Sequence, residues 1–321
     1  MNQHRKDDTA TIAERSPLQR LPLVSVVIPT YNRPDFLRQA LASVLNQDYC
    51  GPIEAIVVFD KTEPDYSLES ERSDRSVRVF RNTRTPGLAG NRNSGILKAT
   101  GELVAFCDDD DTWRPNKLSS QVRALHDSPQ HDFVTTAMAV DFKSKTIDRL
   151  AGRTEVDHSA FFTSRMAMLH SSSFMARRSA FLGDLGLVDE TLPQSMAEDR
   201  ELLIRATQLK PILHVDEPLI NVRWAETSYF AQDWKVRNEA SLWLLKRYPE
   251  LHQNRTAAAL SYGKLAFGNA ALRHRREALS WARRAFKANW REPRTYLATA
   301  VVSGLSWRWV MKQLNGRGRG I

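Results

Sequence analysis

This chain has little cysteine and no long uncharged apolar run. Its 321 residues include two cysteines, Cys50 and Cys107, which excludes a disulfide scaffold and argues against a thiolate metal site. The nearest approach to an apolar run, Tyr296 to Trp307, is shorter than the ~20 residues of a membrane-crossing helix and is followed at once by Arg308. With 42% hydrophobic and 26% charged residues, the composition is that of a globular protein with a sizeable core.

The first twenty residues, MNQHRKDDTATIAERSPLQR, contain no apolar segment. A secretory signal peptide needs one, so this stretch cannot serve as a signal. We expect residues 1–20 to form a disordered lead-in. Together with the lack of a spanning segment, this feature predicts a cytoplasmic protein.

Positive charge is concentrated near the C-terminus. From Gln253 to Ile321 there are fourteen Lys and Arg and two acidic residues, a balance of +12, so the rest of the chain carries 32 basic and 35 acidic residues, or −3. A basic segment of this kind binds nucleic acid, an anionic membrane or a polyanionic substrate, or is the solvated surface of helices. Tryptophans beside cations between Trp307 and Lys312 suit a helix in a membrane interface, and equally a helix packed on its own domain.

Short apolar runs alternate with helical patterns in the first third of the chain. Apolar residues from Leu37 to Leu45 recur at the spacing of one helical face. The alternation predicts an α/β fold with a mostly parallel sheet that is covered by helices on both faces. The runs that predict buried strands are Leu23 to Ile28, Ala55 to Phe59, Val77 to Phe80 and Leu103 to Cys107.

Polar residues follow three of these strands, at the edge where ligands bind in such sheets. They are Thr30 to Arg33, Asp60 and the run Asp108 to Asp111. Two charges about 4 Å apart repel by ~4 kcal/mol at a dielectric of about 20, so four adjacent carboxylates favour a compensating cation such as Mg²⁺ or Mn²⁺. In an extended chain Asp108 and Asp110 share a side and are the predicted metal pair, while the four adjacent aspartates leave the register of that pair open. A solvated acidic turn is the alternative.

Several segments together resemble the family 2 glycosyltransferases. The resemblance covers about residues 22–224 and implies an inverting hexosyltransferase with the Rossmann-like GT-A fold, which moves a sugar from a nucleotide diphosphate donor. The segments are VSVVIPTYNRPDFLRQALASVLNQ (Val24 to Gln47), RNSG (Arg92 to Gly95), FCDDDDTWRPNKL (Phe106 to Leu118), GLVDETL (Gly186 to Leu192) and AEDRELLIRA (Ala197 to Ala206).

The resemblance also implies roles for single residues. Asp199 would be the catalytic base, Asp60 would accept a hydrogen bond from the base or ribose, and Asp108 with Asp110 would bind the metal. Many family members have Asp-Asp-Gly-Ser after the second strand, whereas here Asp60 is the only carboxylate in that stretch. The residues expected at the nucleotide-sugar are Pro29, Thr30, Tyr31, Arg33, Asp60, Arg92, Asp108 and Asp109.

Three further residues have two interpretations each. Arg92 faces the donor diphosphate or is a surface residue. Glu198 orients the acceptor or caps the helix that follows it. His170 borders the acceptor pocket or is a structural histidine.

The signature Q-x-x-R-W of processive synthases is incomplete in this chain. Arg223 and Trp224 match its end, but Ile220 stands where its glutamine should be, and the channel helices of those synthases are missing. We therefore expect a non-processive enzyme.

We expect a nucleotide-sugar domain at residues 21–225 and a basic helical region at residues 226–321. In the helical region, Phe267 to Ala270 followed by Glu277 to Leu279 and Ala285-Phe286 resembles one degenerate tetratricopeptide hairpin. The predicted donor is UDP-linked and the acceptor is a hydroxyl of a glycan or of a lipid-linked sugar. The basic helices would contact the anionic inner face of the plasma membrane as a peripheral protein, and no nucleic acid partner is expected.

Two other functions compete with this prediction. A nucleotidyltransferase also places aspartates and a divalent ion at a nucleotide, but it would show a glycine-rich phosphate loop, which Thr30 to Pro34 is not. A non-catalytic GT-A-like binding protein would have no need of Asp60, the aspartate run and Glu198-Asp199 together.

Overall fold

The computed structural model describes residues 20–142, 145–164, 166–224 and 233–316. The predicted lead-in, residues 1–20, lies outside the described residues except for its last one.

One large sheet forms the centre of the molecule. Apolar residues fill β1 (Val24–Thr30), β2 (Ile53–Phe59) and β5 (Leu103–Phe106), because these strands are covered on both faces. β1 pairs in parallel with β2 and β5, and β2 pairs in parallel with β4 (Arg75–Arg81). The predicted parallel strands are thus confirmed.

Beyond β5 the sheet is mixed. The described residues form eleven strands in the order β3-β4-β2-β1-β5-β10-β7-β11-β6, with β8 beside β7 and β9 beside β11. β10 runs antiparallel to both β5 and β7. The remaining strands are β3 (Ser70–Glu71), β6 (Thr112–Trp113), β7 (Phe133–Phe142), β8 (Lys145–Arg149), β9 (Glu155–Val156), β10 (Met175–Arg177) and β11 (Ile212–Arg223).

The long strand β11 passes through Pro218. Its pairing with β7 shifts register between Val215 and Pro218 and again before Ile220. Proline has no N–H for a sheet ladder and is tolerated at such irregularities, so the strand continues past it.

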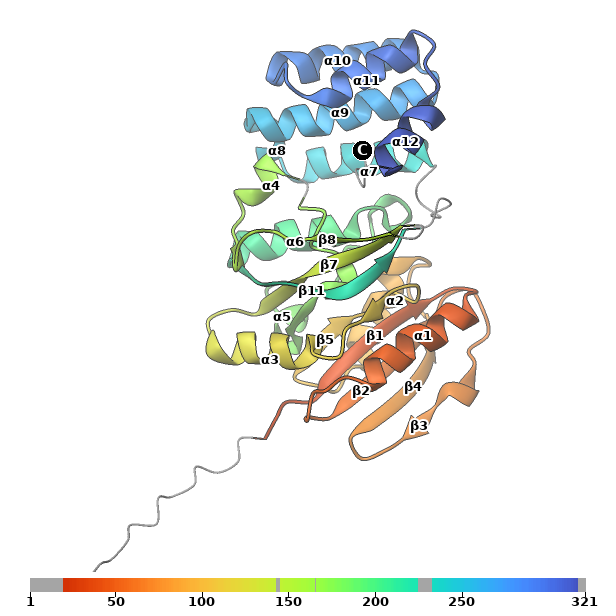
Figure 1. Ribbon diagram of the computed structural model, residues 1–321, viewed down its shortest axis with the longest axis vertical. Helices are drawn as coiled ribbons and strands as arrows, with labels where there is room; N and C mark the ends of the chain where they lie inside the picture. Colours follow the sequence, from red (N-terminus) through yellow and green to blue (C-terminus); the bar gives the residue numbers. More distant parts are fainter. Residues whose placement is uncertain (1–19, 143–144, 165, 225–232, 317–321) are drawn as a thin grey trace, which may run out of the picture.

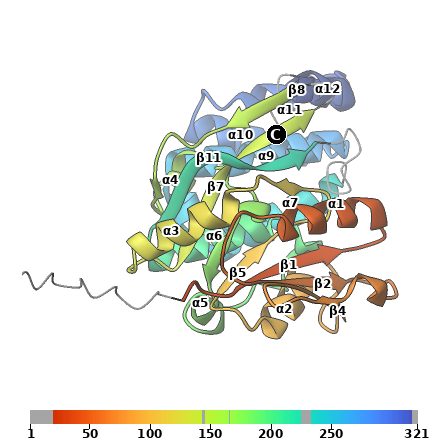
Figure 2. The same cartoon turned by 60° about the horizontal axis from the view of Figure 1, so that its bottom comes forward.

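Helices cover both faces of the sheet, as expected. Val24, Val26 and Ile28 face the cluster that contains α1 (Pro34–Leu45) and α3 (Lys117–Asp127), whereas Val27 faces α2 (Leu88–Lys98). Figure 2 shows α1 and α2 on opposite sides of β1 and β2. α2 can lie close to β1 because Gly95 has no side chain. A Cβ at this position would come within 2.3 Å of a methyl group of Val27.

The other elements on the α2 side belong to residues 160–209 and to the C-terminal region. Within residues 160–209 these are α4 (Ala160–Thr163), α5 (Arg178–Leu182), α6 (Glu198–Leu209) and the 3-10 turns η2 (Ser171–Ser173) and η3 (Pro193–Ser195). A further 3-10 turn, η1 (Tyr66–Leu68), lies between β2 and β3 in the chain.

The C-terminal region is helical, as predicted, and stacks above the sheet in Figure 1. Leu244 and Leu265 belong to the same core cluster as Leu202 of α6, so the core continues across the predicted domain boundary. α9 and α10 pack together as a helical hairpin. The resemblance of this hairpin to a tetratricopeptide repeat stays a prediction. The helices are α7 (Trp234–Arg247), α8 (Glu250–Gln253), α9 (Arg255–Ala271), α10 (Arg275–Ala288), α11 (Pro293–Val302) and α12 (Trp307–Gly316).

Within the described residues, none of the helices combines the length and the apolarity that crossing a membrane requires.

Candidate functional site

The turn after β1 lies against the aspartate run. The Thr30 hydroxyl donates a hydrogen bond to Asp109 at 2.8 Å, and one guanidinium nitrogen of Arg33 lies 3.3 Å from Asp109 and 2.6 Å from Asp110. Burial raises the pKa of Asp109 to about 6. The first and third ligand-edge signals of the sequence therefore meet in space.

The two other residues predicted in this turn differ in exposure. Pro29 lies inside β1, paired with Val58 of β2, so its side chain is buried. Tyr31 is 48% exposed, and its N–H points to Asp109 at 3.4 Å. Thr30, Arg33 and Phe59 line a hollow of about 220 Å³ beside this turn.

Asp60 follows β2 and is buried. One of its carboxylate oxygens accepts a hydrogen bond from the Asn82 amide at 3.0 Å, and the other accepts one from the Gly87 N–H, also at 3.0 Å. Gly87 has φ of 120°, a conformation that favours glycine. Asp60 therefore holds the turn that begins α2, and its contact with a nucleoside stays a prediction.

Asp108, Asp111 and His170 form a cluster that could hold a metal ion. One potential ligand atom from each lies within 4.8 Å of the other two. The Asp111 N–H donates to the Asp108 carbonyl at 3.1 Å, and Ser172 connects the two residues by accepting from the Asp108 N–H and donating to the Asp111 carboxylate. Two carboxylates and an imidazole suit Mn²⁺ or Mg²⁺.

This cluster differs from the predicted metal pair, Asp108 with Asp110, which stays a prediction. The prediction of Asp108 with Asp110 assumed that the strand continues through the aspartate run, but β5 ends at Phe106 and the chain turns after Asp108. The turn brings Asp111 next to Asp108, whereas Asp110 lies against Arg33. The alternation of side chains that holds in a strand does not hold in this turn.

Arg92 connects the aspartate run with the Glu-Asp motif. It is 1% exposed and donates to Asp108 at 2.6 Å with one terminal nitrogen and to Glu198 with the other. Burial opposes the charged form of Arg92, but Asp108 and Glu198 raise its pKa. Burial also raises the pKa of Glu198 to about 7, against the effect of Arg92. Arg92 is thus no surface residue, and Glu198 contacts Arg92.

The segment before α6 explains how Glu198 reaches this position. Gln194, Ser195 and Ala197 have φ of 49°, 56° and 67°, values that residues other than glycine rarely adopt. The Ser195 hydroxyl accepts a hydrogen bond from the Ala89 N–H at the start of α2. The N-terminus of α6 is thereby docked on the N-terminus of α2, which carries Arg92.

Asp199 is partly exposed at the first turn of α6, where a helix N-terminus stabilises an ionised carboxylate. One of its oxygens accepts a hydrogen bond from the Arg200 N–H at 2.7 Å. Burial alone would lower the pKa of His170, but the negative charges of Asp111, Asp108 and Asp199 raise it. His170 therefore feels the charge of Asp199 as well as the charges of the two aspartates in its own cluster.

Sequence reasoning missed Asp111, Ser171 and Ser172. The serines follow His170 directly, and the Ser171 hydroxyl donates to Asp108 at 2.8 Å. The polar run HSSS before an apolar strand was the available signal. Because this run lies about sixty residues from the aspartates along the chain, the sequence alone did not indicate that the two segments are in contact.

Residues 25–183 match the family described as Glycosyl transferase family 2. The chain belongs to this family. The match covers β1 through α5, including the whole aspartate run and His170. It argues against the nucleotidyltransferase alternative.

Bacterial relatives match about a third of this chain. The GalNAc(5)-diNAcBac-PP-undecaprenol beta-1,3-glucosyltransferase of Campylobacter jejuni is 33% identical over 117 residues, which are 35% of this chain and 38% of that protein. The UDP-Glc:alpha-D-GlcNAc-diphosphoundecaprenol beta-1,3-glucosyltransferase WfgD of Escherichia coli is 35% identical over 104 residues, 32% of this chain and 41% of its own length. In both cases the chain spans about two fifths of the relative.

Solved structures share the fold over most of the chain. The structure of S. aureus TarS residues 1–349 in complex with UDP has a TM-score of 0.61 at 20% identity and covers 92% of each chain. The mannosyltransferase PcManGT from Pyrobaculum calidifontis, in complex with GDP-Man and Mn²⁺, has a TM-score of 0.54 at 18% identity and covers 94% of this chain and 81% of its own. The GT-A fold with a C-terminal helical region is thereby confirmed.

Proposed function

We propose that this protein transfers a hexose from a UDP-linked donor to a hydroxyl of a glycan or lipid-linked acceptor, with inversion and with a divalent cation. The observation that carries the proposal is the Asp108–Asp111–His170 cluster, which lies within electrostatic reach of Asp199. The relatives named as glucosyltransferases of undecaprenol-linked glycans, and the related folds solved with UDP or GDP-Man, support the substrate classes.

In the proposed reaction Asp199 accepts the proton of the acceptor hydroxyl as that oxygen attacks the anomeric carbon. A positioned carboxylate contributes about 10²–10⁴ to such a step. It lies at the first turn of α6, the helix end that favours negative charge, and Glu198, held by Arg92, orients that turn toward Asp108.

On the donor side, Asp108, Asp111 and His170 would hold Mg²⁺ or Mn²⁺, and the bound ion would stabilise the charge of the departing diphosphate. Thr30 and Arg33 flank the same edge and are proposed to contact the nucleotide. The nucleoside diphosphate leaves from the face opposite the attacking hydroxyl, which inverts the anomeric centre.

The proposal is tested by supplying the purified protein with UDP-glucose, UDP-galactose, UDP-N-acetylglucosamine and GDP-mannose in the presence of Mn²⁺ or Mg²⁺. We expect metal-dependent release of the nucleoside diphosphate from at least one UDP-sugar, and loss of the release with EDTA. The absence of both UDP-sugar hydrolysis and UDP binding in calorimetry would contradict the proposal.

A matched pair of variants tests the metal ligands. Asp111→Asn is expected to weaken Mn²⁺ binding at least about tenfold, because the loss of even outer partners of a metal site costs 10–100-fold. Asp110→Asn, one residue away and outside the cluster, should bind Mn²⁺ nearly as the wild type does. The reverse order in calorimetry would restore Asp108 with Asp110 as the metal pair.

A further inference from the structure

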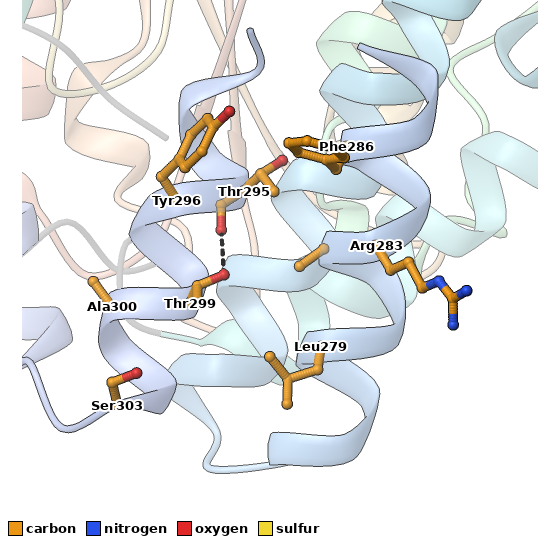
Figure 3. Close-up of a pocket in the computed structure, with 9 residues that line it drawn as sticks. Leu279, Arg283, Phe286, Thr295, Tyr296, Thr299, Ala300 and Ser303 are labelled. Atoms are coloured by element: carbon orange, nitrogen blue, oxygen red, sulfur yellow. Dashed lines mark hydrogen bonds between the residues drawn. The ribbon is translucent and has the colours of Figure 1, made fainter. Parts of the chain in front are cut away.

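Large apolar side chains are exposed along the outer side of α10 and α11. Leu279 and Phe286 lie two helical turns apart on α10 and are 47% and 49% exposed, and Tyr296 of α11 is 50% exposed. They line a groove of about 580 Å³ between the two helices. Figure 3 shows Phe286 and Tyr296 at one end of this groove and Leu279 and Ser303 at the other.

Trp290, in the turn between the two helices, extends this apolar surface. It is 59% exposed, its carbonyl accepts a hydrogen bond from the Tyr296 hydroxyl, and the guanidinium of Arg291 lies 5.1 Å from its ring centroid. We call Leu279, Phe286, Trp290 and Tyr296 the apolar face.

The surroundings of the apolar face are strongly positive. Of the acidic residues between 271 and 314, Glu277 is exposed, whereas Glu292 is buried and paired with Arg294 at 2.7 Å. The exposed basic residues of the same described stretch are Arg273, Arg275, Arg276, Arg283, Arg284, Lys287, Arg291, Arg308 and Lys312.

We propose that the apolar face and its arginines dock the protein on an anionic lipid bilayer. Half-exposed aromatic and leucine side chains beside cations are the composition of helices that lie in a membrane interface. Nine exposed basic residues against one exposed acidic residue favour a negatively charged partner. Arg283 lines the groove itself, and an arginine there can reach lipid phosphates while its stem stays among apolar groups.

The position of the surface agrees with this role. α10 and α11 lie at the end of the molecule opposite β3 and β4 (Figure 1), away from the strands of the donor side. The inference deepens the proposed function, because a lipid-linked acceptor is presented at a bilayer. A protein held there by α10 and α11 would meet its acceptor on a surface.

Vesicle flotation with the full chain tests the inference. We expect binding to vesicles of phosphatidylcholine with phosphatidylglycerol, weaker binding at high salt, and little binding to phosphatidylcholine alone. Leu279→Ser with Phe286→Ser should weaken binding about tenfold or more, because apolar area is no longer buried. Arg283→Ser should weaken it about fivefold, which corresponds to ~1 kcal/mol for one basic residue near the surface.

The matched control is Leu97→Ser with Leu182→Ser, which removes two leucines of similar exposure, 45% and 49%, from the catalytic domain. This variant should bind vesicles as the wild type does. Equal binding by the Leu279 and Phe286 variant would overturn the inference. A wild-type protein that does not bind vesicles would also overturn it. That includes the case in which light scattering shows a dimer formed through these residues instead.

Hydrolysis of UDP-sugars in the same preparations, without vesicles, separates this inference from the proposed function. Hydrolysis without vesicle binding would contradict the docking inference and support the proposed function. Vesicle binding without hydrolysis or UDP binding would support the docking inference and contradict the proposed function.

Discussion

Arg92 joins two carboxylates that lie ninety residues apart in the sequence, Asp108 and Glu198. Burying a guanidinium is costly unless it is paired, and here both terminal nitrogens have a carboxylate partner. Burial raises the pKa of Asp108 and Arg92 lowers it, with a net lowering. Removing Arg92 would leave two carboxylates facing each other in the interior, so its pairing fixes the relative position of the donor-side and acceptor-side segments.

At the same scale, Asp199→Asn tests the proposed base. The variant keeps the size of the side chain and the hydrogen bond from the Arg200 N–H, so the fold and UDP binding should be unchanged. Transfer to an acceptor should fall about 10²–10⁴-fold, because asparagine cannot accept the proton. Radiolabelled sugar transfer measures the loss, and near-normal turnover would remove Asp199 from this role.

Among the elements, α3 carries a buried lysine under the aspartate turn. Lys117 has no exposed surface, its ammonium lies 3.7 Å from the ring centroid of Trp113, and it donates to the Gln121 side chain at 2.7 Å. Gln121 in turn donates to the Ser173 carbonyl at 2.7 Å. α3 thereby supports the serine turn that follows His170.

Burial lowers the pKa of Lys117 from 10.5 to about 7. Between these values the unfolded chain binds the proton that the folded protein has lost, so stability rises with pH in this window. From pH 7 to pH 9 the wild type should gain about 2 kcal/mol relative to Lys117→Met. Urea unfolding at both pH values measures the difference, and the exposed lysine variant Lys246→Met is the control that should show none.

For the molecule as a whole, the C-terminal helices complete the support of α6. The Tyr248 hydroxyl, which follows α7, donates to Glu201 of α6 at 2.6 Å, and Glu201 also pairs with Arg205 at 2.9 Å. Arg205 donates to the carbonyls of Leu185 and Leu187, which lie between α5 and α6 in the chain. The helix that begins with Glu198-Asp199 is therefore held from the C-terminal region as well as from α2.

Tyr248→Phe removes one hydrogen bond of this contact and leaves the packing of the ring. We expect the free energy of unfolding to fall by about 1–2 kcal/mol, because a buried carboxylate loses a donor. Denaturant unfolding measures it, with Tyr66→Phe, an exposed tyrosine, as the control. Equal stability of the Tyr248 variant and the wild type would show that the helical region does not stabilise α6 through this contact.

The fold and the ligand edge were predictable because their signals are local. Val24 to Thr30 is rich in β-branched apolar residues, Pro34 begins a helix with one apolar face, and the aspartates follow Cys107 directly. Each of these features depends on neighbours in the chain, and parallel strands bring their carboxyl ends to one edge. Asp199 was reached through the family resemblance, and its role stays a prediction.

The contacts between side chains from distant segments depend on tertiary packing and could not be predicted from the sequence. Neither the spacing of the residues nor their types showed that Asp111 rather than Asp110 joins Asp108, that His170 completes the cluster, or that Arg92 binds Glu198. These contacts exist because a turn replaces the end of β5 and because α6 begins against α2. The sequence determined by itself which elements form and which polar residues follow the strands, since periodicity and strand ends are local properties. Only the tertiary structure decided which charges meet, since that depends on how elements far apart in the chain pack on one another.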